Sequence, residues 1–180
     1  MEKNDLISNE YKKINKKIYS HVGQGQGGAK HAEIVKQLSK KLDAKTILDY
    51  GCGQGQFKNA LDAFKEGFQV SEYDPAIKGK DHLPGKADLI VCADVLEHIE
   101  PDKIDNVLAH IFELMQKGGY FIIALCETKI FLPDGRNAHI LLKPVDWWLQ
   151  KMMGFDCDIL HCSVRVKKKQ IKDVVLWIQK

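Results

Sequence analysis

The fold of this chain is decided by residues 47–55, which read ILDYGCGQG. A short apolar run ends at the acid Asp49, and Gly51, Gly53 and Gly55 follow in close succession. Beyond them, residues 56–65 place apolar side chains at helical spacing. The pattern predicts a strand, a tight turn and a helix. Glycines let the turn approach a ligand closely, and the start of the helix offers free N–H groups to that ligand.

A second acid closes the next apolar run of the chain. Asp74 follows residues 68–73 and lies 19 residues beyond Gly55. An acid about 20 residues past a glycine turn can hydrogen-bond the hydroxyls of a ribose. These residues together predict a site for a cofactor that carries adenosine, whereas the alternative is a glycine turn without a ligand.

The order D-x-G-x-G-x-G, formed by Asp49 and the glycines that follow it, resembles motif I of the class I S-adenosylmethionine-dependent methyltransferases. The dinucleotide-binding fingerprint spaces its glycines differently, as G-x-G-x-x-G. A cationic sulfonium with an amino-acid tail is helped by a carboxylate such as Asp49, directly or through water. The resemblance implies that S-adenosylmethionine is the cofactor and that Tyr50 and Ala93 contact it. It also implies that Asp81, followed by His82, contacts the adenine amine; a solvated loop acid is the alternative.

Strands and helices alternate along the chain, which implies a parallel sheet with right-handed crossovers. Residues 155–166 and 171–178, joined by lysines at 167–169, predict a closing hairpin. We expect an α/β, Rossmann-like, mostly parallel sheet with helices on both faces and an antiparallel strand from the C-terminal hairpin. The methyltransferase sheet has seven strands, but residues 76–86 are too few for a strand with its helix, so a reduced sheet is expected. The remaining strands are expected at 46–50, 68–73, 88–93 and 120–126, and helices at 30–42, 57–64, 95–99, 104–115 and 145–153.

The 180 residues suit one methyltransferase domain. A lysine-rich amphipathic helix is expected over residues 5–19. Residues 1–29 would then form this helix and a glycine-rich lid that includes Tyr19 and His21, and residues 30–180 the catalytic core. A break in the helix of residues 104–115 is expected at Gly118 and Gly119.

Composition and short motifs narrow the classes of protein to which this chain can belong. The formal net charge of +3 is mild and neither demands nor excludes nucleic acid. The chain has no apolar run of membrane-spanning length and no signal-peptide pattern at its start, so we expect a cytoplasmic protein without a membrane partner. The five cysteines include no C-x-x-C pair and are expected to be reduced. Residues 92–95, CADV, lack the Pro-Pro-aromatic run typical of DNA amine methyltransferases.

Residues 87–98, ADLIVCADVLEH, resemble the fourth motif of many methyltransferases, in which V-L-E-H follows a strand. At positions i, i+3 and i+4 of a helix start, Asp94, Glu97 and His98 would share a face toward the carboxyl edge of the sheet. The long connection over residues 127–143 brings His139 to the same crevice. Carboxylates and imidazoles so placed predict a site for Mg²⁺ or Mn²⁺.

The segment also resembles the E-x-x-E-H segment of metal-dependent O-methyltransferases, namely the small-RNA terminal 2′-O-methyltransferases and those of ubiquinone biosynthesis, although Asp94 replaces the first glutamate. The alternative is a helix capping box made by Asp94 and Glu97, with structural histidines. Either histidine that does not bind a metal, His98 or His139, is a candidate general base.

The substrate side is expected in the same connection. Arg136 would pair with a phosphate or carboxylate of the acceptor, or else with Asp134 or Asp146. Of Trp147 and Trp148, we expect one indole in the core and the other at the acceptor or the cofactor.

The leading expectation is methyl transfer from S-adenosylmethionine to a hydroxyl oxygen of a small-molecule or sugar-like acceptor, assisted by a metal. An RNA ribose 2′-O-methyltransferase is the first alternative, with RNA phosphates contacted by the lysines of residues 12–17 and 167–169. A non-catalytic module that binds adenosylmethionine is the second. The acceptor, the metal and the oligomeric state are not determined by the sequence.

Overall fold

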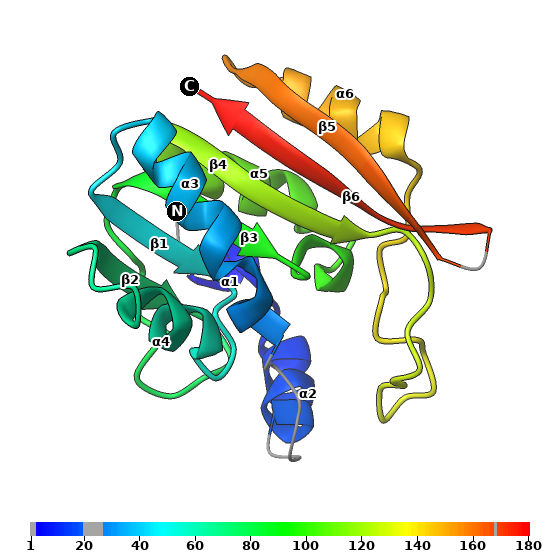
Figure 1. Ribbon diagram of the computed structural model, residues 1–180. Coiled ribbons are helices and arrows are strands. Elements are labelled where there is room, and N and C mark those ends of the chain that lie inside the picture. The colour runs from blue at the N-terminus through cyan, green and yellow to red at the C-terminus, as the bar shows by residue number, and fades with distance from the viewer. Residues whose placement is uncertain (1–2, 20–26, 168) are drawn as a thin grey trace.

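The computed structural model describes residues 3–19, 27–167 and 169–180 (Figure 1). The predicted glycine-rich lid falls largely on residues 20–26, outside the described residues, as does His21. In chain order the elements are α1 (Lys3–Leu6), α2 (Asn9–Tyr19), the 3-10 helix η1 (Gly27–His31), α3 (Ala32–Lys41), β1 (Thr46–Tyr50), α4 (Gln56–Asp62), β2 (Gln69–Tyr73), β3 (Ala87–Ala93), the 3-10 helix η2 (Leu96–His98), α5 (Ile104–Leu114), β4 (Met115–Ala124), α6 (Val145–Met153), β5 (Asp158–Lys167) and β6 (Gln170–Gln179).

The strands form one sheet in the order β2-β1-β3-β4-β6-β5. The first four pair in parallel, with β1 at register Tyr50 to Tyr73 on β2 and β3 at register Ala93 to Ile122 on β4. Then β6 runs antiparallel to both β4 and β5, as expected of the hairpin. The mixed α/β architecture of the prediction is confirmed. Six strands lie in the described residues, and residues 76–86 contain none, in agreement with the expected reduction.

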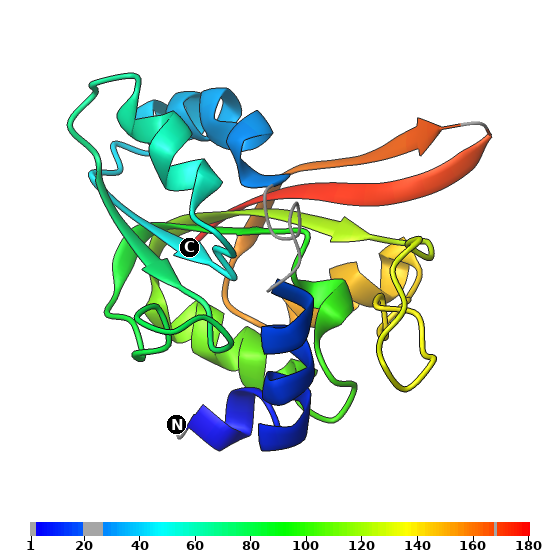
Figure 2. The same ribbon diagram turned by 90° about the horizontal axis from the view of Figure 1, so that it is seen from below.

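Helices cover both faces of the sheet (Figure 2). On one face α3 and α4 pack, with Val35, Leu38 and Phe57 buried against Leu89 and Ile122. On the other face lie α5 and α6, and the core there includes the fully buried Trp148 of α6. Residues of β4 alternate between the two cores, because successive side chains of a strand point to opposite faces. None of the helices in the described part of the chain is both long and apolar enough to cross a membrane.

Two predictions of helix boundaries are wrong. The predicted helix over residues 95–99 is the three-residue η2, and β4 begins at Met115, so Gly118 and Gly119 lie inside a strand. A β-carbon on Gly118 would lie 2.4 Å from the carbonyl oxygen of Ile178, and one on Gly119 would lie 2.4 Å from Phe121. The two glycines therefore permit close approach within the sheet and its core, as glycine in a strand interior often does.

The N-terminal region forms two helices where one was predicted. Leu6 of α1 belongs to the core beside α5, while Ile7 and Tyr11 pack against Leu132 and Ala138 of the connection after β4. The N–H of Ser8 between the helices donates to Glu100. Through these contacts α2 stands beside the carboxyl edge of the sheet, where β1, β3 and β4 all end (Figure 1).

Candidate active site

The glycine turn after β1 is held by backbone hydrogen bonds to the end of β2. Gly51 has a φ of +78°, which favours glycine, and its N–H donates to the Tyr73 carbonyl at 2.7 Å. A β-carbon there would lie 2.4 Å from Val95. Gly55 caps α4 in the left-handed conformation. The predicted strand, turn and helix are present at residues 46–62.

Asp74 is buried and closes this turn from the second strand. Its carboxylate accepts the N–H of Gly53 at 3.2 Å and that of Ala76 at 2.9 Å. The acid predicted to bind ribose thus also fixes the glycine turn.

A cavity of about 230 Å³ opens above the glycine turn, at the carboxyl ends of β1 and β3. Ligands of open α/β sheets bind at this edge. Of the predicted residues, Asp49, Gly51, Gly53, Ala93, Asp94 and His98 line it. An aliphatic wall of the cavity comes from α2 and the connection after β4, through Ile18, Ile130, Leu132 and Ala138.

Asp49 brings an unusual carboxylate to this cavity. It is 6% exposed, and its Oδ2 has no hydrogen-bond partner among the described residues. Burial, followed by the charge of Glu72, raises the pKa of Asp49 to about 7. A cation bound beside this buried carboxylate would stabilise its charged form.

A smaller cavity of about 70 Å³ adjoins the first and shares Asn15, Gly51, Asp94 and His98 with it. It is lined further by Asp74 and its neighbours Pro75 and Ala76, by Val95, Ile99 and Glu100, and by Leu6, Ile7 and Tyr11 of the N-terminal region. Asp74, predicted to contact the ribose, therefore lies at a cavity that is continuous with the glycine turn.

Four predicted cofactor residues line neither cavity. The Tyr50 side chain lies in the core, where its hydroxyl pairs with Nδ1 of His110 at 3.0 Å. Gly55 lies at the start of α4, behind the turn. Asp81 forms an ion pair with Lys12 of α2 at 3.2 Å, and His82 is exposed. The Tyr50 side chain lies in the core because alternate residues of β1 face opposite sides of the sheet, so a predicted contact with the cofactor would have to come from its backbone.

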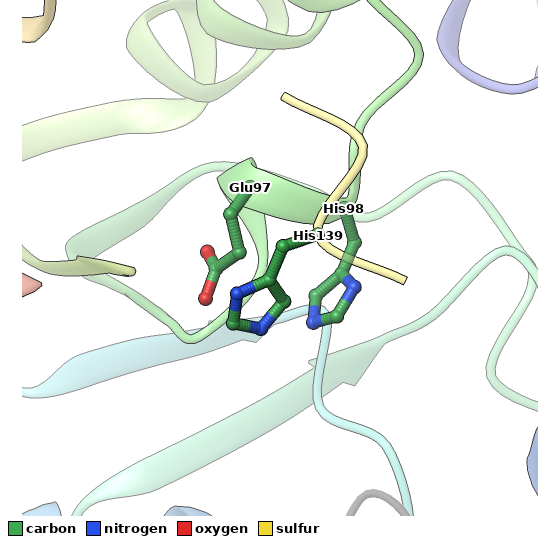
Figure 3. Close-up of side chains that lie close together, drawn as sticks. All are labelled: Glu97, His98 and His139. Atoms are coloured by element: carbon green, nitrogen blue, oxygen red, sulfur yellow. The ribbon is translucent and has the colours of Figure 1, made fainter. Parts of the chain in front are cut away.

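Glu97, His98 and His139 meet beside the main cavity (Figure 3). The candidate ligand atoms of the three lie within 4.8 Å of one another. The first two come from η2, and His139 comes from the connection after β4. The Leu141 N–H donates to the Glu97 carbonyl at 3.0 Å, which ties this connection to η2. The sequence predicted that these three side chains would gather.

Asp94 is not part of that group, contrary to the prediction. It stands at the sharp turn after β3 with a φ of +59°, so it does not share a helical face with Glu97 and His98. Its carboxylate pairs instead with Lys30 at 3.1 Å and lies 4.0 Å from Nε2 of His31. Burial alone raises the pKa of Asp94, but the contacts with His31 and Lys30 outweigh it and lower the pKa to about 2.

The surroundings of Glu97, His98 and His139 favour the binding of a cation. Glu97 is 1% exposed, and its Oε2 lacks a hydrogen-bond partner among the described residues. Burial raises the pKa of Glu97 above its ordinary value. In each histidine Nδ1 faces a carbonyl oxygen, that of Ala138 at 2.8 Å for His98 and that of Cys126 at 2.5 Å for His139. Such contacts assign the proton to Nδ1 and leave a lone pair on Nε2. Burial also lowers the pKa of His98, which favours the neutral imidazole.

The Asn137 side chain makes three hydrogen bonds within the connection that carries His139. Oδ1 of Asn137 accepts the N–H groups of Thr128 and His139, and its Nδ2 donates to the Thr128 carbonyl. Arg136 is exposed and binds Asp134 two residues away, at 2.6 Å and 2.9 Å, which is the alternative foreseen for it. Trp148 is the core indole, whereas Trp147 packs beside Lys143 and Lys151 and lines neither cavity.

Sequence reasoning missed His31, Asn15 and the aliphatic wall. His31 ends η1, is 4% exposed and lines the main cavity. Its only sequence signal is its place three residues after Gly28, the end of the glycine-rich segment, and directly before α3.

Comparison with known proteins identifies the family and the fold of this chain. The family model of the methyltransferase domain matches residues 24–164. The chain is 31% identical over 117 residues to the chloroplastic magnesium protoporphyrin IX methyltransferase of Arabidopsis thaliana, in a match that covers 48% of this chain and 37% of that protein. The chain thus spans little more than a third of that relative's length.

Two solved structures show the shared fold. The 1,6-didemethyltoxoflavin-N1-methyltransferase of Burkholderia thailandensis, solved with S-adenosylhomocysteine, has a TM-score of 0.69 and 16% identity, over 97% of this chain and 90% of that one. The magnesium protoporphyrin IX methyltransferase of Synechocystis, solved with S-adenosylmethionine, has a TM-score of 0.57 and 16% identity, over 99% and 95% of the two chains. Because the family model covers most of its length, the chain belongs to the methyltransferase domain family.

Proposed function

We propose that this chain transfers a methyl group from S-adenosylmethionine to a hydroxyl oxygen of a small-molecule acceptor. The observation that carries the proposal is Asp49, which lines the main cavity and whose buried Oδ2 has no hydrogen-bond partner among the described residues. The ammonium of the methionine portion supplies the cation that such a carboxylate needs. Of the two related structures, the didemethyltoxoflavin methyltransferase holds S-adenosylhomocysteine and the magnesium protoporphyrin IX methyltransferase holds S-adenosylmethionine.

The ribose hydroxyls of the adenosine portion are assigned to the smaller cavity, which Asp74 lines. There Asp74 would bind the ribose hydroxyls and still hold the glycine turn, since each carboxylate oxygen accepts more than one hydrogen bond. Asp81 would contact the adenine amine only by exchanging its ion pair with Lys12, which makes it the weakest of the predicted cofactor contacts.

The acceptor is assigned to the space between the aliphatic wall and the polar residues Asp94 and His98. A cavity of about 230 Å³ is somewhat smaller than the typical small-molecule site of about 300–1,000 Å³, so a small acceptor is expected, and its wall of Ile130 and Leu132 suits an apolar body. Two of the related proteins are named for small-molecule acceptors, a didemethyltoxoflavin and a magnesium porphyrin.

A divalent metal fits the group of Glu97, His98 and His139. The unpartnered Oε2 of Glu97 and the two Nε2 lone pairs form a set of two imidazoles and one carboxylate, which binds first-row metals. When bound, such an ion lowers the pKa of an acceptor hydroxyl and orients it. Glu97 and the two histidines would hold the ion, with the carbonyls of Ala138 and Cys126 fixing both rings.

Calorimetry with S-adenosylhomocysteine tests the cofactor assignment, and heat of binding is expected. Incubation with S-adenosylmethionine labelled at the methyl group, in a cell extract separated into RNA, glycan and small-molecule pools, then tests the acceptor. Label is expected in the small-molecule pool. An absence of binding heat would refute the proposal, and label confined to RNA would replace the acceptor class with RNA ribose.

Thermal unfolding with Mn²⁺ or Mg²⁺ tests the metal. An ion at about 100 times its Kd should raise the Tm by about 5–10 °C. Glu97→Gln should abolish this rise, while Glu100→Gln, three residues away and outside the group, should retain it. An unchanged Tm together with full methyl transfer in a chelator would remove the metal from the proposal.

A further inference from the structure

His31 is a buried histidine in the wall of the main cavity that the proposed function leaves without a role. It is brought there by the close packing of η1 on α4, because a β-carbon on Gly28 would lie 2.8 Å from Cβ of Phe57. It lies close to Asp94 at the end of β3. Among the described residues that line this cavity, His31 and His98 are the histidines.

The two nitrogens of His31 have different surroundings. Nδ1 faces the buried hydroxyl of Tyr120 at 3.4 Å, whereas Nε2 has no hydrogen-bond partner among the described residues. A proton on Nδ1, donated to the Tyr120 oxygen, leaves the lone pair on Nε2. This nitrogen lies 4.0 Å from Oδ2 of Asp94, beyond hydrogen-bond distance, and both residues line the main cavity.

We propose that His31 is a catalytic residue, the general base that removes the proton from the acceptor hydroxyl; this inference rests on the proposed function. The acceptor O–H bond breaks, and its proton moves to Nε2 of His31. The acceptor oxygen forms a bond to the methyl carbon as the bond from that carbon to sulfur breaks. The products are the methyl ether, neutral S-adenosylhomocysteine and an imidazolium at His31.

The surroundings of His31 suit this exchange of charge. Asp94 remains ionised, since its pKa is lowered to about 2, and it stabilises the imidazolium once it forms. Lys30 balances the carboxylate before the reaction through its 3.1 Å ion pair. His98 is less suited, because a metal in the neighbouring group would occupy its free nitrogen.

The test compares His31→Gln with His161→Gln, a matched change at an exposed histidine of β5 outside both cavities. The probes are S-adenosylhomocysteine for binding and, for transfer, labelled S-adenosylmethionine with the small-molecule filtrate of a cell extract. His31→Gln should bind S-adenosylhomocysteine like the wild type and transfer methyl about 10²–10⁴-fold more slowly. His161→Gln should leave both binding and transfer unchanged. Added imidazole should partly restore transfer by His31→Ala, which a purely structural role for His31 does not predict.

The outcomes separate the two proposals. A wild-type protein that binds no S-adenosylhomocysteine, or labels nothing in the filtrate, refutes the proposed function and this inference with it. Normal binding with undiminished transfer by His31→Gln refutes the inference alone, as does a loss that imidazole does not restore. If the His31 variants fail to fold, Tyr120→Phe decides: it removes the partner of Nδ1, so a slower transfer at unchanged binding is expected, and an unchanged rate overturns the assignment.

Discussion

The two ends of the main cavity are built in different ways. At the proposed cofactor end, Asp49, Gly51 and Gly53 come from one short stretch, and backbone hydrogen bonds to Tyr73 fix their turn. At the proposed acceptor end, His31, His98 and Leu132 come from three segments far apart in the chain. One end is therefore specified by local backbone geometry and the other by tertiary contacts.

The second difference is in how each end is held. The glycine turn is locked by N–H groups that donate to a strand carbonyl and to the Asp74 carboxylate. The connection after β4 depends on the Asn137 side chain and on contacts with η2. We therefore expect substitutions at the cofactor end to reduce stability and ligand binding more than substitutions at the acceptor end.

The largest effect is expected from Gly51→Ala. The new β-carbon would lie 2.4 Å from Val95 at a φ of +78°. Backbone strain and overpacking together should lower the free energy of unfolding by about 2–5 kcal/mol and abolish binding of S-adenosylhomocysteine. Urea unfolding and calorimetry measure the two effects.

Gly67→Ala is the control for that change. Gly67 has a similar φ of +76°, but outside its chain neighbours no heavy atom lies within 4 Å of the place that a β-carbon would take. In this variant the free energy of unfolding should fall only by the backbone strain of about 1–2 kcal/mol. Equal losses in the two variants would contradict the role assigned to the contact with Val95.

Asp49→Asn should weaken the binding of S-adenosylhomocysteine by about 10–100-fold, since a charged hydrogen bond is worth about 1.5–3 kcal/mol. The same change should stabilise the protein without ligand at pH 7, because a buried charge is removed. Calorimetry and urea unfolding should show effects of opposite sign, and a loss of both affinity and stability would contradict a ligand-binding role for Asp49.

Asp49 also makes stability depend on pH. Its pKa is about 7 in the folded protein and about 3.9 in an unfolded chain, so the folded state binds more protons between these values. The free energy of unfolding should therefore fall as pH rises from about 4 to 7, by up to about 4 kcal/mol from this group. Glu97 acts in the same direction. Asp49→Asn should flatten the decline, and an unchanged slope in a urea series across pH would contradict the raised pKa.

Asn137→Ala should have a smaller effect, confined to the acceptor end. It removes three hydrogen bonds of the connection after β4, and we expect a loss of about 1–3 kcal/mol in the free energy of unfolding. Methyl transfer should fall while the affinity for S-adenosylhomocysteine is kept. A large loss of that affinity would show that the two ends are not independent.

The smallest effect is expected from Arg136→Ala. Its exposed ion pair with Asp134 contributes about 0–1 kcal/mol, so stability and binding of S-adenosylhomocysteine should barely change. A slower methyl transfer at unchanged affinity would support the predicted contact between Arg136 and a charged acceptor. A loss of stability as large as that of Asn137→Ala would contradict the small contribution assigned to this exposed ion pair.

Much of the fold could be predicted because its signals are local. The glycines after β1 mark the turn, the spacing of apolar residues marks α6 at Val145–Met153, and the short interval after Asp74 marks the reduced sheet. The start of β4 could not be predicted in this way. Residues 115–119 become a strand because β3 and β6 supply partners on both sides, which no local pattern records.

By itself the sequence determined the order of the elements, the glycine turn with Asp49 and the meeting of Glu97, His98 and His139. These follow from short-range backbone preferences and from the rule that parallel strands end at one edge of the sheet. Only the tertiary structure decided that Asp94 turns toward Lys30, that Asp81 pairs with Lys12 and that His31 enters the cavity. The direction of a side chain there depends on charges and packing from segments distant in the chain, and these act only after the chain has folded.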